Sequence, residues 1–237
     1  VAAPESAKPS QMGHLGDLVF PTVQFEKATI SECIEYFQIK SRDLDPGKKG
    51  ITFLVDEATR KSGASITIDL KEIRVVDLIE CFARIARLEV SFAGEAVQLK
   101  TTPSVKPPFP IGVPTQKLQK LGETIFPTVN FNKATLEEAC EYLRIKSRDL
   151  SGEHFNLVID PDFTKRKHEI TLALTQVPLS DALAYITEMC DAEVAYLAAA
   201  IYIQPRSSAA AQSPLKIGTP TSKLQKVGET IIPTMQF

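Results

Sequence analysis

A segment of 21 residues that occurs twice constrains this chain more than any other feature. Residues 111–131, IGVPTQKLQKLGETIFPTVNF, recur at 217–237 as IGTPTSKLQKVGETIIPTMQF, with 15 of the 21 positions identical and a spacing of 106 residues. Residues 15–25 match residues 121–131 at the same spacing. Solenoid units of roughly 20–50 residues bury a core only by stacking, so this much longer period predicts self-sufficient modules with separate cores.

The repeat and the composition between its copies set the expected boundaries. We expect a flexible lead-in at 1–14, a first module at 15–102, a Pro-rich linker and leader at 103–120, a second module at 121–205, and a linker with the first strand of a truncated third repeat at 206–237. The prolines of the first linker are typical of a semi-rigid spacer, and the Ala- and Ser-rich second linker of a looser one. The modules could then adopt several orientations, and the third leader indicates a longer repeat array.

Hydrophobic periodicity predicts the order β-α-β-β-α-β-β in each module. Residues 30–37 carry apolar side chains at the i, i+3, i+4, i+7 spacing of a helix, and residues 66–70 alternate as a half-buried strand does. Capping boxes at 29–32 and 135–138 open the first helix of each module. Pro21 interrupts the first strand, which predicts a bulge or an edge position. The predicted fold class is α+β, an α/β sandwich of helices packed on small sheets.

Composition and charge exclude some classes of function. The chain has 27 Lys and Arg against 29 Asp and Glu, so its overall charge does not favour binding to nucleic acid or an anionic membrane. No apolar run approaches the roughly 18 residues that span a bilayer, so no membrane insertion is expected. A KH-like nucleic-acid binder is a further alternative, but the chain has no GXXG loop, and its basic runs at 48–49 and 165–167 are typical of solvated loops.

The cysteines fall at positions that are not equivalent in the two copies: Cys33, Cys81, Cys140 and Cys190. Because their counterparts are Ala, Tyr and Ile, they are most simply small core residues. A disulfide within each module, Cys33–Cys81 and Cys140–Cys190, is the alternative that an oxidising compartment would permit.

Catalytic and cofactor motifs are not found in the sequence. His14, His154 and His168 have no partners at the spacing of a triad or a metal site, and the chain contains no GxxxxGK[ST], GxGxxG or GxSxG. We therefore predict no enzymatic activity, no cofactor and no metal.

Two repeated polar segments are the candidates for binding a partner. The hexapeptide IKSRDL is identical at 39–44 and 145–150, and its Arg–Asp pair could bind a partner or, structurally, suit a helix C-terminus. The leader, KLQK-x-GET-I at 117–125 and 223–231, is kept while the cores diverge. It was duplicated recently, or it packs on the preceding module as a strand or cap, where it could cover a sheet edge by β-augmentation. The candidate residues are Arg42, Asp43, Arg148, Asp149, Lys117, Gln119, Lys120, Glu123, Lys223, Gln225, Lys226 and Glu229.

Both modules resemble the short domain at the N-terminus of secretins and TonB-dependent receptors. The resemblance covers roughly 18–100 and 124–204 and rests on the helix pattern A-T-[IL]-x-E-[AC]-x-x-[YF], a strand followed by Asp56 or Asp160, I-T-[IL]-x-L, and a second helix that begins near Asp77 or Asp181. It implies a periplasmic adaptor that docks protein partners and has no catalytic residues. Two tandem modules with no barrel or secretin domain behind them depart from the usual arrangement of that family.

These observations lead to a main hypothesis and an alternative from another class. We expect a periplasmic or envelope-facing scaffold, its signal peptide removed, that binds an envelope protein or neighbouring copies of the same module, with possible homo-oligomers through the C-terminal strand. The alternative is a small-ligand-binding or enzymatic unit with a site between the modules, which predicts a cleft where the two Arg–Asp pairs converge.

Overall fold

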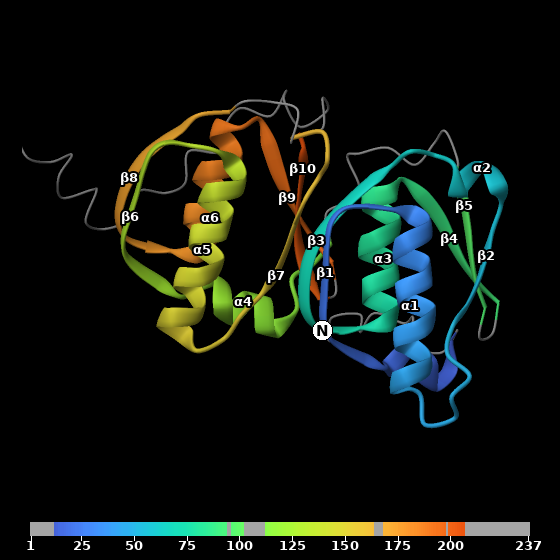
Figure 1. Ribbon diagram of the computed structural model, residues 1–237. Helices are drawn as coiled ribbons and strands as arrows, with labels where there is room; N and C mark the ends of the chain where they lie inside the picture. The colour runs from blue at the N-terminus through green and yellow to red at the C-terminus, as the bar shows by residue number, and fades with distance from the viewer. Residues whose placement is uncertain (1–11, 94–95, 102–111, 164–167, 198, 207–237) are drawn as a thin grey trace, which may run out of the picture. The chain divides into compact units, whose positions relative to one another are not determined.

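Two runs of strands and helices in nearly the same order form the described part of the chain (Figure 1). The computed structural model describes residues 12–93, 96–101, 112–163, 168–197 and 199–206. The first run is η2 (Gly13–Asp17), β1 (Val19–Thr29), α1 (Ile30–Leu44), β2 (Thr52–Val55), α2 (Glu57–Arg60), β3 (Ser65–Arg74), α3 (Val75–Ala86), β4 (Leu88–Ala93) and β5 (Ala96–Thr101). The second is α4 (Gln116–Gly122), β6 (Ile125–Ala134), α5 (Leu136–Ser151), β7 (Asn156–Ile159), β8 (Ile170–Pro178), α6 (Leu179–Met189), β9 (Ala192–Tyr196) and β10 (Ala200–Pro205).

We call these runs the first repeat (residues 12–101) and the second repeat (residues 112–205). Contacts between residues place both within one unit, residues 1–205; of the other unit, 206–237, only residue 206 is described. The mixed α/β class with open sheets is as predicted, and the order of strands and longer helices agrees with the sequence analysis. The short helix α2 was not expected, because its four residues are too few to show a helical period.

Each repeat contains a two-stranded and a three-stranded sheet. The antiparallel pairs are β1–β3 and β6–β8, and the larger sheets have the strand orders β2-β5-β4 and β7-β10-β9. In both larger sheets the central strand is parallel to its first neighbour and antiparallel to its second. The helices contact both sheets of their repeat, since α1 contacts β1 and β2 while α3 contacts β3 and β4.

The backbone of the two repeats matches at unusual positions. Lys27 and Lys133 adopt positive φ angles of 54° and 55°, which non-glycine residues rarely do. Each donates its backbone N–H to a threonine on the paired strand, Thr67 or Thr171, at 3.1 Å. The register shifts beside these lysines, so the bulge of β1 lies after Phe25 and not at the proline.

The proline position is nevertheless explained by the sheet. Pro21 and its counterpart Pro127 are exposed on β1 and β6, each of which has a single neighbouring strand. A residue without a backbone N–H is tolerated at such an edge. The predicted edge position is therefore confirmed.

Capping boxes begin the first long helix of each repeat, as predicted. Glu32 accepts a hydrogen bond from the Thr29 N–H at 2.7 Å, and Thr29 Oγ1 accepts one from the Glu32 N–H at 3.3 Å. Thr135 and Glu138 repeat this exchange at 2.8 and 3.2 Å. The boxes satisfy backbone donors that the helix itself leaves unpaired, which fixes where α1 and α5 start.

The apolar side chains form two clusters, and the first is not confined to the first repeat. One cluster contains residues of the second repeat alone. The other joins the core of the first repeat to residues of the second repeat's larger sheet and its hairpin: Val158, Ala195, Leu197, Ala200 and Tyr202. The expectation of a separate core for each module is therefore wrong for the first repeat.

The leader folds as helix α4 and not as a strand. Thr115 caps this helix, and its buried Leu118 and Leu121 belong to the core of the second repeat, the repeat that α4 precedes. In the first repeat, Met12 and Leu15 are buried at the equivalent positions beside α3. The leader is thus a cap on its own repeat and not on the preceding one, while its second copy at 223–231 lies outside the described residues.

All four cysteines are buried free thiols, which agrees with their interpretation as core residues. Burial raises the pKa of the Cys33 thiol to about 12 and that of Cys190 to about 11. Burial likewise raises the pKa of Cys81 and of Cys140. None of these thiols therefore has the acidic character of a reactive cysteine.

A buried carboxylate organises the turn after α1. Asp45 is fully buried and accepts hydrogen bonds from the N–H groups of Gly47, Lys49 and Gly50 at 3.0, 2.8 and 3.2 Å. His14 Nε2 lies 3.1 Å from the same carboxylate and ties η2 to this turn. Burial raises the pKa of Asp45, but these hydrogen bonds outweigh it and hold the pKa well below its usual range.

Replacement of this carboxylate tests its contribution to stability. Because the folded-state pKa is depressed, the stabilisation is present above the unfolded-state pKa of about 4 and is lost as the pH falls toward the folded-state value. We expect Asp45→Asn to lower the urea midpoint at pH 7 and to flatten its decline below about pH 4. The exposed Asp43→Asn is the matched control and should change neither; an unaltered acid decline in Asp45→Asn would contradict the assignment.

Candidate functional site

The larger sheet of the second repeat is buried on both faces. Ile201 and Ile203 of β10 belong to the second repeat's own core. Ala200 and Tyr202, which point to the opposite face, are fully buried in the cluster that contains the core of the first repeat. We call this opposite side the outer face of the sheet; its burial makes the contact between the two repeats the best-defined recognition surface in the described residues.

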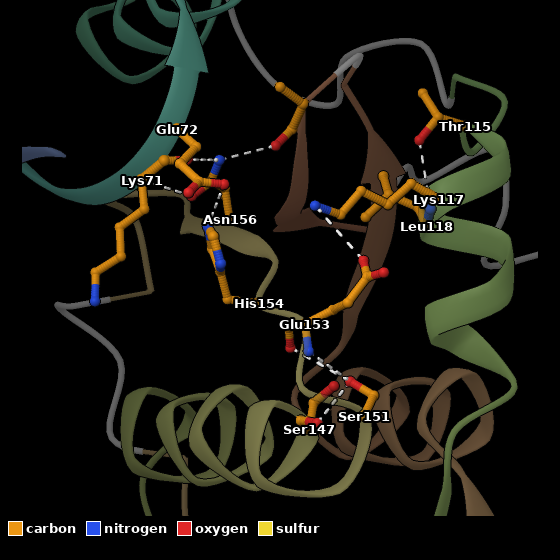
Figure 2. A network of polar contacts seen from close by, with 11 residues as sticks. Lys71, Glu72, Thr115, Lys117, Leu118, Ser147, Ser151, Glu153, His154 and Asn156 are labelled. Atoms are coloured by element: carbon orange, nitrogen blue, oxygen red, sulfur yellow. Dashed lines mark hydrogen bonds and ion pairs between the residues drawn. The ribbon is translucent and has the colours of Figure 1, made fainter. Parts of the chain in front are cut away.

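One asparagine joins the second repeat to a strand edge of the first. Lys71 of β3 donates its backbone N–H to Asn156 Oδ1 at 2.8 Å, and Asn156 Nδ2 donates to the Lys71 carbonyl at 3.0 Å (Figure 2). The same amide nitrogen donates to the Ala199 carbonyl at 3.1 Å. Among the described strands β3 is hydrogen-bonded to β1 alone, and its other edge contacts β7, so this amide satisfies backbone groups that no strand ladder pairs.

A buried charge cluster forms a second link. Arg87, directly after α3, lies 3.1 Å from Asp160 and 2.9 Å from Asp162 of the second repeat. The Asp160 side chain is fully buried and also accepts a hydrogen bond of 2.8 Å from the Tyr202 hydroxyl. Burial, together with this carboxylate, raises the pKa of Tyr202, so the hydroxyl remains a donor. A buried carboxylate is tolerated only when it is paired in this way.

A third link is made by the first long helix of the second repeat, α5. Arg144 of α5 lies 2.9 Å from Asp69 on β3 and 2.8 Å from Glu141, one turn earlier on its own helix. The hydrogen bond with Arg144 lowers the pKa of Glu141, and the bonds of Arg144 to both carboxylates raise its own pKa. The contact between the repeats thus has an apolar centre and a rim of ion pairs and hydrogen bonds, as protein interfaces do.

A polar cleft of about 300 Å³ lies beside this contact. Both repeats and the start of α4 contribute to it, with Lys71, Arg74 and Asp77 on one side and Lys117, His154 and Asn156 on the other. Several charges there are paired, and Arg74 donates to Asp77 at 2.8 Å. Lys117 lies 3.6 Å from Glu153, and His154 lies 4.0 Å from Glu72 (Figure 2). Among the described residues, the cleft shows neither a nucleophile–base pair nor a cluster suited to a metal ion.

The two Arg–Asp pairs do not converge on this cleft. All four side chains, Arg42, Asp43, Arg148 and Asp149, are exposed on the last turns of α1 and α5. They line none of the three described cavities. The shared IKSRDL segment instead buries its serine, and Ser41 Oγ accepts a hydrogen bond from the Ile51 N–H at 2.9 Å.

The polar leader residues lie on the exposed side of α4 and the turn after it. They are Lys117, Gln119, Lys120 and Glu123. Lys117 makes the ion pair with Glu153, and Gln119 donates to the Pro114 carbonyl at 3.2 Å. Their second copies, Lys223, Gln225, Lys226 and Glu229, lie outside the described residues.

Sequence reasoning missed the residues that join the repeats: Arg87, Asn156, Asp160 and Tyr202. A signal was present in the last strand of each repeat. β5 reads AVQLK and alternates as a half-exposed strand does, whereas the equivalent residues of β10 read AIYIQ and are apolar on both faces. A continuous apolar run of this length is typical of a strand buried on both sides.

We compared the chain with known proteins and found that no family profile, curated protein or solved structure matches it. Within the described ranges, no helix is both long and apolar enough to cross a membrane.

Equivalent substitutions in the two repeats test the charge cluster. Arg87 and Asp191 occupy matching left-handed positions, with φ angles of 56° and 52°, and asparagine tolerates this conformation. We expect Arg87→Asn to lower the free energy of unfolding by about 1–3 kcal/mol, because Asp160 stays buried without its cation. Asp191→Asn, at an exposed position, should change it by less than about 0.5 kcal/mol in urea denaturation. Equal losses at the two sites would contradict the role of Arg87.

Proposed function

We propose that this chain is a non-enzymatic interaction or scaffolding protein of the bacterial cell envelope, built from tandem short domains of the secretin and TonB-dependent-receptor type. The observation that carries the proposal is the contact between the repeats. A sheet face of one repeat is recognised by a helix and a strand edge of the other, through an apolar centre with a polar rim. Repeats that contact each other in this way are better suited to protein assembly than to catalysis.

The roles of the motif residues in the described fold support the same assignment. The A-T-x-x-E pattern forms the capping boxes. The aspartate after the second strand has a structural role in each copy: Asp56 accepts from the Thr59 N–H at 2.7 Å at the start of α2, and Asp160 pairs with Arg87. Fold and contact thus account for these residues of the pattern.

A ligand-binding or enzymatic unit is the weaker candidate. The cleft between the repeats is lined by charges that already have partners, such as Arg74 with Asp77 and Lys117 with Glu153. Desolvation raises the pKa of Asp77 while its hydrogen bonds with Arg74 lower it, so burial prevails over the ion pair. An arginine bound through two hydrogen bonds at the start of α3 is typical of a structural pair at a helix N-terminus.

Capture from cell fractions tests the proposed function. We expect the immobilised chain to retain a defined envelope protein from an envelope extract of the host bacterium, and to retain neither RNA nor DNA at low salt. The chain carrying Arg42→Glu and Arg148→Glu is the control, because both side chains are exposed and their replacement should leave the fold intact. Mass spectrometry identifies what is retained; recovery of cytosolic ribonucleoproteins alone would contradict the proposal, and loss of binding in the control would move the partner site to the two helix ends.

A further inference from the structure

The second repeat exposes the surface that is covered in the first. Cys81 and Ile85 of α3 are buried, with exposed fractions of 0% and 4%, and belong to the cluster that includes the second repeat's outer sheet face. Their counterparts on α6, Tyr185 and Met189, are 52% and 45% exposed. Adjacent large apolar side chains left this exposed on a helix of 11 residues indicate a surface that takes a partner.

The strand edge beside α6 has the same character. Thr175 of β8 occupies the position of Lys71, whose backbone N–H and carbonyl are held by Asn156 in the first repeat. Thr175 is exposed, and of the described strands only β6 pairs with β8. The second repeat therefore has an exposed apolar helix face beside an uncovered strand edge. In the first repeat, the corresponding helix face and strand edge are covered by the larger sheet of the second repeat.

The outer face of the first repeat's larger sheet differs from that of the second repeat. On the first repeat's larger sheet, the positions equivalent to Asn156, Ala195, Tyr202 and Gln204 are Thr52, Ser91, Gln98 and Lys100. These four side chains are polar and at least partly exposed, while Leu54, the equivalent of Val158 on the same face, is 50% exposed. A largely polar outer face is typical of the terminal cap of a repeat array, whereas the α6 face lacks this character.

The charges at the end of α6 determine which partner its exposed face would bind. The end of α3 carries Arg84 and Arg87, and Arg87 pairs with Asp160. The equivalent positions at the end of α6 are the acidic Glu188, in its last turn, and Asp191, just after it. A sheet with an aspartate at the Asp160 position would place two carboxylates together, which disfavours this chain's own sheets as partners because both carry aspartate there.

We propose that the exposed face of α6, with the free edge of β8, docks the outer sheet face of a further repeat of the same fold that carries a basic residue at the position of Asp160. This inference rests on the proposed scaffolding function and specifies its partner. The interface extends the one observed between the first two repeats in the same direction. The leader that precedes the second repeat as α4 recurs at 223–231.

The full chain can test the proposal once the outer-face residues of the second repeat's larger sheet are grafted onto the β2-β5-β4 sheet of the first repeat. Thr52→Asn, Ser91→Ala and Gln98→Tyr introduce the second repeat's outer-face residues at positions that are at least partly exposed. We expect this grafted chain to associate head to tail only weakly, because Asp56 and Asp191 repel each other, and Asp56→Lys, which places a cation opposite Asp191, to tighten the association at least ~10-fold in sedimentation velocity.

Two further variants keep the test decisive. Asp56 also caps α2, so Asp56→Lys changes its own turn as well; Asp191→Arg in the grafted chain with Asp56 retained should tighten association from the other side. Tyr185→Glu should abolish it in either case. A grafted chain that stays monomeric with Asp191→Arg, or an association that Tyr185→Glu leaves unchanged, would overturn the proposal. Because this assembly needs no envelope partner, its result is independent of the capture experiment.

Discussion

Burial of both faces of the β7-β10-β9 sheet is the constraint on which the rest of the described structure depends. A sheet covered on two sides needs apolar residues on both, and every polar group at its rim needs a partner. Asn156 and Asp160 meet this requirement through Lys71 and Arg87 of the first repeat. The two repeats are therefore coupled through one sheet, and the core of the first is completed by residues of the second.

The two repeats share a backbone but not a surface. Arg87 and Asp191 follow equivalent helices in the same left-handed conformation and carry opposite charges. Cys81 and Tyr185 are equivalent, yet one is buried and the other is half exposed. The low identity between residues 66–100 and 170–204 is thus more than drift within a core, because the same positions face the other repeat in one copy and solvent in the other.

Local features of the fold could be predicted from the sequence, and contacts between the repeats could not. The capping boxes at Thr29 and Thr135 and the helical spacing that begins at Ile30 depend on residues within a few positions of each other, so a pattern reveals them. The bond between Lys71 and Asn156 joins residues 85 positions apart, and neither residue type marks it. Arg42 and Arg148, the polar residues singled out by repetition, lie on exposed helix ends.

The position of α4 redefines where a repeat begins. The prolines of residues 103–114 place residues 117–120 with the linker, yet Leu118 and Leu121 fill the second repeat's core, as Met12 and Leu15 fill the first. The folding unit therefore starts at the helix cap Thr115, several residues before the first strand. The pattern of strands alone would suggest a boundary at residue 121. A fragment that begins there would lack Leu118, and the apolar residues that Leu118 covers beside α6 would be exposed to solvent. Domain boundaries in chains of this kind are better drawn from the buried leucines of the leader than from its prolines.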